Sequence, residues 1–84
     1  MTGPTMVSYN NISGDSNVIG YDLYDDGITV YFIDGFSYTY TNQSAGEEVI
    51  SQMKYAAQTG EGLNSLINQN AKYNYVQKEY FSSY

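Results

Sequence analysis

Tyrosine is the most conspicuous candidate for ligand or partner binding in this chain. It accounts for 11 of the 84 residues. A tyrosine ring can stack on a nucleobase, and tyrosine is also enriched at protein–protein interfaces. Tyr38 and Tyr40 stand two residues apart, so in a strand both rings would lie on one face. Either they stack a ligand or they are core residues whose hydroxyls reach the rim, and the register predicted below favours the core.

Catalytic and metal-binding constellations are not evident. The chain has no His, Cys or Arg, which removes Ser–His and Cys–His nucleophile pairs, disulfides and thiolate zinc sites. Asp22, Asp25 and Asp26 have carboxylate oxygens, but their spacing fits no Ca²⁺ loop. Glu47 and Glu48 are neighbours on a predicted helix and so point apart. We therefore expect no enzyme activity, no cofactor and no metal site.

The charge balance indicates the kind of partner. Nine acidic residues against three lysines give a net charge of −6. Phosphate backbones are bound through clustered Lys and Arg, so this chain should repel nucleic acid at long range. We expect a protein partner with a basic surface, with a nucleotide or RNA disfavoured by charge. No apolar run is long enough for a membrane span, and the N-terminus does not look like a signal peptide, so we expect a cytoplasmic protein without membrane contact.

Two Asp-Gly pairs predict a three-stranded antiparallel meander over residues 17–25, 28–33 and 36–41. At Asp26-Gly27 we expect a tight primed turn that pairs Leu23 with Val30. Over residues 33–35 we expect a three-residue turn with Gly35 in the left-handed region, which pairs Phe32 with Phe36. The predicted core face is Ile19, Tyr21, Leu23, Ile28, Val30, Phe32, Phe36, Tyr38 and Tyr40. The predicted outer face is Val18, Asp22, Tyr24, Thr29, Tyr31, Ile33, Ser37, Thr39 and Thr41.

Two helices should follow the meander. Ser44 and Glu47 have capping-box spacing, which places Gly46 inside a helix that ends at Gly60. The apolar stripe of this helix is Val49, Ile50, Met53, Ala56 and Ala57. Leu63, Leu66 and Ile67 predict a second helix over about 62–70. The fold class is α+β, with both helices packed on one face of the sheet.

The two ends of the chain are less regular in pattern. Residues 1–15 are expected to be a loose N-terminal segment, in which Val7–Tyr9 could add a short strand at a sheet edge. Residues 71–84 form an aromatic C-terminal tail whose apolar spacing fits either a helix or a strand. The uncovered outer face predicts a homo-oligomer, most simply a dimer, unless one of the two ends folds over that face.

An ordered set of residues in this chain resembles the KTSC family. The set comprises the Ile-Gly-Tyr-Asp run ending at Asp22, the turn at Gly35, the Tyr38-x-Tyr40 pair, the helix of Val49 to Met53, and the Gly-Leu-Asn run ending at Asn64. This small domain is named after a C-terminal extension of some lysyl-tRNA synthetases and also occurs alone in bacteria and phages. The resemblance covers residues 16–70 and implies a domain of unknown function in a bacterial host cell, for which RNA binding has been suggested.

The chain departs from the family pattern at two places. Asn68 stands where members often have Arg, which weakens an RNA-binding interpretation, and the aromatic tail is an addition.

These observations predict a non-enzymatic binding module, and the hypothesis for its role is a phage-type acidic inhibitor of a host nucleic-acid-handling or defence protein. The alternative is a binder of a nucleotide, a nucleotide-derived signal or a short RNA through tyrosine. The candidate ligand- or partner-binding residues are Tyr24, Tyr31, Tyr38, Tyr40, Asn64, Tyr73 and Tyr75.

Overall fold

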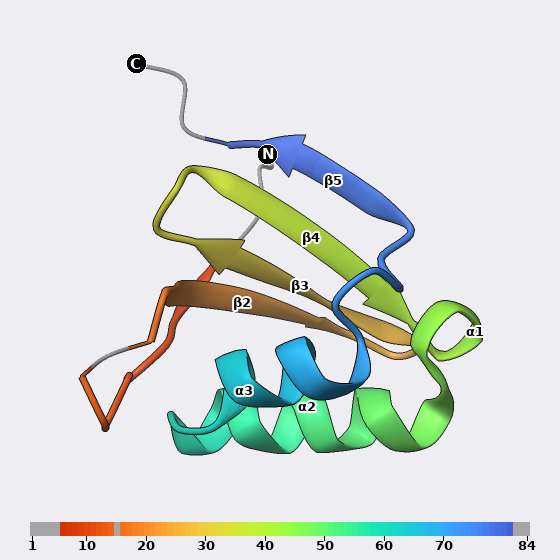
Figure 1. Ribbon diagram of the computed structural model, residues 1–84, viewed down its shortest axis with the longest axis horizontal. Helices are drawn as coiled ribbons and strands as arrows, with labels where there is room; N and C mark the ends of the chain where they lie inside the picture. Colours follow the sequence, from red (N-terminus) through yellow and green to blue (C-terminus); the bar gives the residue numbers. More distant parts are fainter. Residues whose placement is uncertain (1–5, 15, 82–84) are drawn as a thin grey trace.

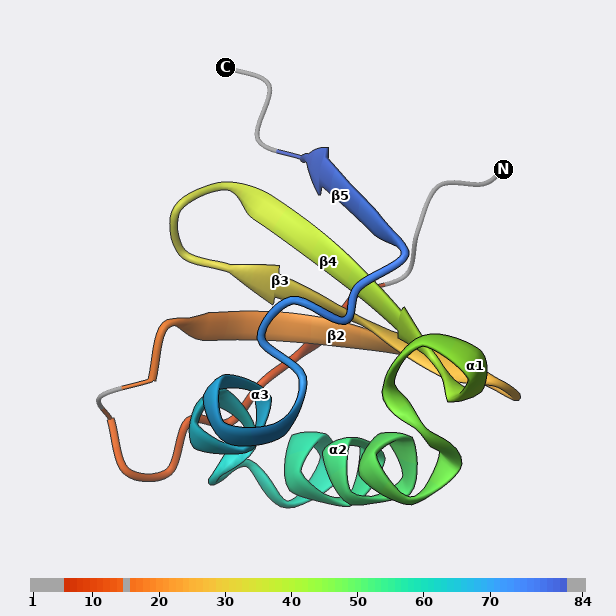
Figure 2. The ribbon, with the colours of Figure 1, turned by 45° about the vertical axis from the view of Figure 1, so that its right-hand side comes forward.

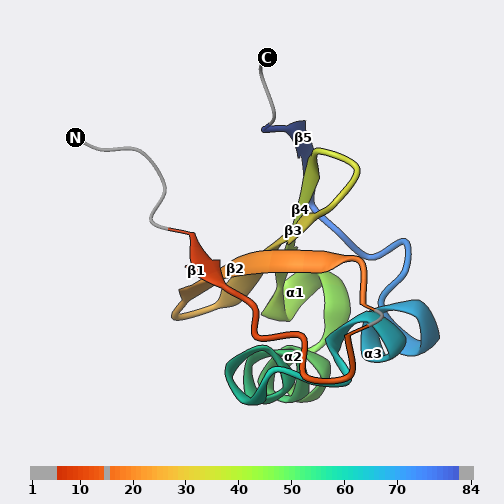
Figure 3. The ribbon, with the colours of Figure 1, turned by 90° about the vertical axis from the view of Figure 1, so that its left-hand side faces the viewer.

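The computed structural model describes residues 6–14 and 16–81, which form a five-stranded antiparallel sheet with helices on one face (Figures 1 and 3). The strands are β1 (Val7–Ser8), β2 (Val18–Tyr24), β3 (Gly27–Phe32), β4 (Phe36–Thr41) and β5 (Gln77–Tyr80), in that spatial order. The helices are α1 (Asn42–Ala45), α2 (Glu47–Thr59) and α3 (Leu63–Asn70). The predicted α+β class is confirmed, and the sheet is larger by two strands than predicted.

The second turn of the meander has the predicted register. Val30 pairs with Tyr38 and Tyr31 pairs with Ser37, which places Phe32 opposite Phe36. Gly35 has a φ of 94°, a conformation that favours glycine, and its N–H donates to the Phe32 carbonyl at 3.0 Å. The bulged three-residue turn is confirmed.

The predicted first turn is wrong. Tyr24 pairs with Gly27, so the turn residues are Asp25 and Asp26, and neither has a positive φ. Gly27 is needed inside β3 for a different reason, because a Cβ there would collide with the Tyr40 carbonyl oxygen of the adjacent strand. The pairing moves by two residues relative to the prediction, so the residues that share a face do not change.

A β-bulge reverses the predicted faces at the start of β2. Val18 pairs with Phe32 and Gly20 pairs with Tyr31, which leaves Ile19 as the extra residue. Val18, predicted on the outer face, is therefore buried at 2% exposure, and Ile19, predicted in the core, is 37% exposed. Leu23 was also predicted in the core but is exposed at the end of its strand.

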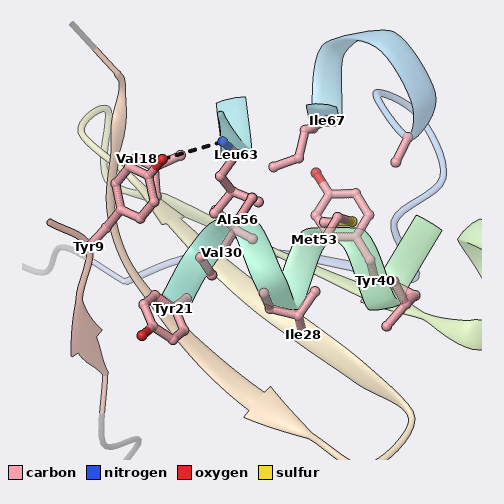
Figure 4. Packing of buried hydrophobic residues seen from close by; sticks show 13 residues of the cluster. Tyr9, Val18, Tyr21, Ile28, Val30, Tyr40, Met53, Ala56, Leu63 and Ile67 are labelled. Atoms are coloured by element: carbon pink, nitrogen blue, oxygen red, sulfur yellow. Dashed lines mark hydrogen bonds between the residues drawn. The ribbon is translucent and has the colours of Figure 1, made fainter. Parts of the chain in front are cut away.

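The core lies between the sheet and the two longer helices (Figure 4). Ile50, Met53, Ala56 and Ala57 of α2 are buried as predicted, and Val49 packs against them. Phe32 and Tyr38, predicted in the core, are only partly buried against it, and Phe36 is partly buried beside the Tyr80 ring. The buried hydrophobic cluster is Tyr9, Val18, Tyr21, Ile28, Val30, Tyr40, Ile50, Met53, Ala56, Ala57, Leu63, Ile67 and Ala71.

The N-terminal segment contributes to both the sheet and the core. Val7 pairs with Tyr21, so the short edge strand expected near Val7 is present (Figure 3). Tyr9 is buried, and its hydroxyl accepts a hydrogen bond at 3.3 Å from the Leu63 N–H at the start of α3 (Figure 4). Residues 6–14 therefore depart from the expectation of a loose segment, and residues 1–5 and 15 lie outside the described residues.

The predicted capping box of Ser44 and Glu47 is wrong, because the capping box lies three residues earlier, at Thr41 and Ser44. The Thr41 hydroxyl accepts from the Ser44 N–H, and the Ser44 hydroxyl accepts from the Thr41 N–H, because a helical turn, α1, starts directly after β4. Gly46 then caps α2 with a φ of 96°, rather than lying inside a helix. Gly60 ends α2 in the left-handed conformation, and α3 follows, as predicted.

A hydrogen-bonded polar layer covers part of the outer face of the sheet. The Tyr31 hydroxyl donates to Asp22 Oδ2 at 2.6 Å, and the Thr29 hydroxyl donates to the Tyr24 hydroxyl at 3.1 Å. The Phe81 and Tyr31 rings pack edge to face, with ring centres 5.0 Å apart. Asp22, Thr29 and Tyr31 are buried, and Phe81 comes from the C-terminal tail, one of the two ends expected as a possible cover for this face. Self-association stays a prediction.

The described part of the aromatic tail contains a strand, β5 (Gln77–Tyr80), which begins after Tyr73 and Tyr75, the residues whose spacing indicated a strand. Lys78 pairs with Tyr38 of β4, and the Val76 N–H donates to the Thr39 carbonyl at 2.7 Å. Figures 1 and 2 show the chain rising from α3 in the helical layer to β5 at the sheet edge. Residues 82–84 of the predicted tail lie outside the described residues. Among the described residues, every helix is too short or too polar to span a bilayer.

Tyr9→Ala should lower the free energy of unfolding by about 3–5 kcal/mol, because it empties a core position and leaves the Leu63 N–H without its acceptor. Tyr55→Ala is the matched control, since Tyr55 is 72% exposed on α2, and it should change stability by less than about 1 kcal/mol. Chemical denaturation of both variants gives the comparison. Equal stability of the two would show that the N-terminal segment does not dock.

Candidate functional site

A cleft of about 380 Å³ lies between β4, α3 and the chain leading into β5. It brings together five of the seven candidate residues predicted from the sequence. They come from three separate parts of the chain, and all line this one cleft: Tyr38, Tyr40, Asn64, Tyr73 and Tyr75. The tertiary structure thus gathers most of the predicted residues into one site.

Strand β4 supplies the floor and one wall of the cleft. Tyr40 is only 1% exposed, and Figure 4 shows its ring in the core with the hydroxyl directed toward Ile67 of α3. Tyr38 is less buried, and its ring makes edge contacts with Phe32 and Tyr75 at centre distances of 5.4 and 5.0 Å. The sequence favoured the core for both tyrosines. The structure gives both a packing role and also places both at the cleft.

The Tyr40 hydroxyl is a neutral hydrogen-bond donor at the cleft. Burial raises the pKa of Tyr40, and the neighbouring Tyr38 and Tyr75 raise it further. Within residues 6–14 and 16–81, no protein group accepts a hydrogen bond from this hydroxyl. It is therefore available to a ligand.

Helix α3 presents two amides to the cleft. Asn64 and Asn68 are four residues apart and so lie on one helical face, together with the buried Ile67. Each amide can both donate and accept a hydrogen bond. Asn68 was noted in the sequence only as a replacement for Arg and was missed as a site residue, although its spacing from Asn64 was a visible signal.

The C-terminal segment supplies two cations and two further rings. The Lys72 Nζ lies 5.5 Å from the centre of the Tyr73 ring, and the Lys78 Nζ lies 4.7 Å from Phe36 and 5.5 Å from Tyr38. Tyr73 is 78% exposed at the rim, and Tyr75 closes one side against Tyr38. The lysines were missed in the sequence because Lys78 is placed by the pairing of β5 with β4, and Lys72 by its position just after the end of α3.

The cleft concentrates positive charge in an acidic protein. Two of the three lysines line it, against one carboxylate, that of Asp34. The third lysine, Lys54, lies elsewhere and donates to the carbonyls of Tyr24 and Asp25 at 2.6 and 3.2 Å. Asn17 completes the polar lining. This arrangement can hold an anion beside aromatic rings.

Tyr24 and Tyr31, the other two candidates, do not belong to this cleft. Both belong to the hydrogen-bonded layer on the opposite face of the sheet, where Tyr31 is buried and Tyr24 is exposed at the side. Burial raises the pKa of the Tyr31 hydroxyl, and its hydrogen bond to the Asp22 carboxylate raises it further. Among the described residues, no three carboxylates lie close enough to hold a metal ion.

Comparisons with protein-family models, with curated proteins and with solved structures found no match for this chain. The resemblance to the KTSC family therefore stays a prediction from the sequence, and the functional argument is based on the cleft.

Alkaline pH should destabilise the protein through Tyr40 and Tyr31. Their folded-state pKa values are raised, so their contribution to stability is complete below the unfolded value of about 10 and is lost as pH rises above it. Tyr40→Phe should change stability at pH 7 by less than about 1 kcal/mol and should make the alkaline decline shallower.

Denaturation curves measured from pH 7 to 11 test this, with Tyr55→Phe as the exposed control. The control should follow the wild type at every pH. An alkaline decline in Tyr40→Phe as steep as that of the wild type would contradict the burial of this hydroxyl.

Proposed function

We propose that this protein is a non-enzymatic binding module whose cleft takes a nucleotide. The observation that carries the proposal is the convergence of Lys72 and Lys78 with the Tyr38–Tyr75 ring pair on one cleft. A nucleotide needs a flat apolar contact for its base and cations for its phosphate. The cleft offers both within a volume near the lower end of the range for small-molecule sites.

The two sides of the cleft suit different parts of such a ligand. Tyr73 and Tyr75 present aromatic surface near the rim, where a base can stack. The amides of Asn64 and Asn68 can exchange hydrogen bonds with the polar edge of a base. The Tyr40 hydroxyl, being neutral, can donate from the floor.

The overall charge limits the length of the ligand. A net charge of −6 repels an extended phosphate backbone, whereas the local excess of lysine over aspartate attracts a small anion. A free nucleotide or nucleotide-derived signal therefore fits better than a long RNA.

Nucleotide binding should quench the tyrosine fluorescence, which is the intrinsic signal of this chain because it lacks tryptophan. Tyr75→Ala should weaken binding by about tenfold or more, because base–aromatic stacking contributes roughly 1–3 kcal/mol per base. Titrations with adenine, guanine, uracil and cytosine nucleotides in low salt measure the affinity.

Tyr55→Ala is the matched control for this experiment, since it removes the same side chain from an exposed position on α2 outside the cleft lining. It should leave the affinity unchanged. Absence of quenching by all four nucleotides, or equal loss in the two variants, would refute nucleotide binding in this cleft.

A protein partner with a basic surface is the second candidate function, in keeping with a phage-type inhibitor of a host protein. The observation that favours it is a separate hollow whose lining has two carboxylates, those of Asp25 and Glu47, against one lysine, Lys54. Acidic groups at such a surface steer a basic partner and make the association sensitive to salt.

Asp25→Asn with Glu47→Gln should reduce capture of a host protein in low salt, and Glu61→Gln, outside this hollow, should not. Unchanged capture by the double variant would contradict this candidate.

A further inference from the structure

We infer that the preferred ligand is a nucleoside monophosphate, with its single terminal phosphate monoester held by Lys72 and Lys78 at the cleft. This inference rests on the proposed function and specifies the class of nucleotide. It follows from the number of cations, their surroundings and the size of the cleft.

The cleft has cations for one phosphate monoester. Such a group carries about −1.5 to −2 at pH 7, and two ammonium groups line the cleft against the single carboxylate of Asp34. Each additional phosphate would bring further negative charge toward Asp34 and into the field of an acidic protein. The chain has no arginine, and Lys54 is engaged with backbone carbonyls elsewhere. Among residues 6–14 and 16–81, no third side-chain cation lines the cleft to meet a longer phosphate chain.

Aromatic neighbours hold both lysines near the cleft before a ligand arrives. Lys78 lies over the Phe36 and Tyr38 rings, and Lys72 lies over Tyr73. A cation–π contact leaves N–H donors of the ammonium group for an acceptor such as a phosphate oxygen. In the described part of the chain, neither ammonium forms an ion pair with a carboxylate. A phosphate would thus meet cations that do not first have to leave a carboxylate.

The size of the cleft points to the same ligand. A volume of about 380 Å³ suits one nucleoside with one phosphate better than a dinucleotide. The base would contact the exposed Tyr73 and Tyr75, which come from the same segment as Lys72.

The test is a comparison of adenosine, AMP, ADP and ATP, repeated with the uridine series, by calorimetry on the full chain. The monophosphate should bind at least about tenfold more tightly than the nucleoside, as expected for hydrogen bonds to charged groups. The diphosphate and triphosphate should bind no more tightly than the monophosphate.

Lys72→Gln and Lys78→Gln should each weaken monophosphate binding by about tenfold and leave nucleoside binding unchanged. Lys54→Gln is the matched control, because it makes the same change of charge outside the cleft lining, and it should alter neither affinity. Lys78→Arg should retain most of the monophosphate affinity, which separates loss of the cation from loss of the fold.

Three outcomes would overturn the inference. They are equal affinity for nucleoside and monophosphate, tighter binding of the triphosphate than of the monophosphate, and equal effects of Lys54→Gln and Lys78→Gln. In each of them the cleft still binds the nucleoside part, so what fails is the assignment of a single phosphate to Lys72 and Lys78. Failure of every compound to bind would instead refute the proposed function itself.

Discussion

The pairing of both edges of β4 is the constraint on which the cleft depends. One edge of β4 pairs with β3, and the other pairs with β5 through the register that sets Lys78 opposite Tyr38. An unpaired edge would leave backbone N–H and C=O groups open to other strands. Because the strand that fills this edge also carries a cation, the same pairing that completes the sheet builds one wall of the cleft.

Strand β5 buries little surface, so a ligand at the cleft would bind only while this strand is docked on β4. All four of its residues are exposed, so little apolar area holds it in place. Its docking depends on backbone hydrogen bonds and on ring contacts such as Tyr38–Tyr75, Phe36–Tyr80 and Tyr31–Phe81. A ligand held between α3 and the C-terminal segment would stabilise the docked strand, since binding to the folded form alone shifts the local equilibrium. The segment also covers part of the outer face, through the contact of Phe81 with Tyr31, which donates to Asp22.

The sequence predicts those parts of this molecule that depend on local pattern. The three central strands, the turn at Gly35 and the buried stripe of α2 follow from alternation, glycine chemistry and helical spacing. The failures come from tertiary contacts: the bulge at Ile19, the close approach of β4 to Gly27, and the Thr41 cap set by the end of β4. For the site, the tyrosines were predicted because this residue type is conspicuous in the sequence. Asn64 was predicted because it ends the Gly-Leu-Asn run that resembles the KTSC family. Lys78 was not, because only the pairing of β5 with β4 places it opposite Tyr38, and Asn68 was missed although its spacing from Asn64 was visible.

Amide hydrogen exchange on the full chain, followed by NMR, tests most directly whether β5 docks on β4. The Val76 N–H donates to the Thr39 carbonyl at 2.7 Å, and the Phe81 N–H donates to the Gly35 carbonyl at 2.8 Å. Both amides should exchange measurably more slowly than in an unfolded chain, though faster than the amides between β2 and β3, because edge strands open locally. Exchange of both amides at the unfolded rate, with the β2–β3 amides still protected, would contradict the account.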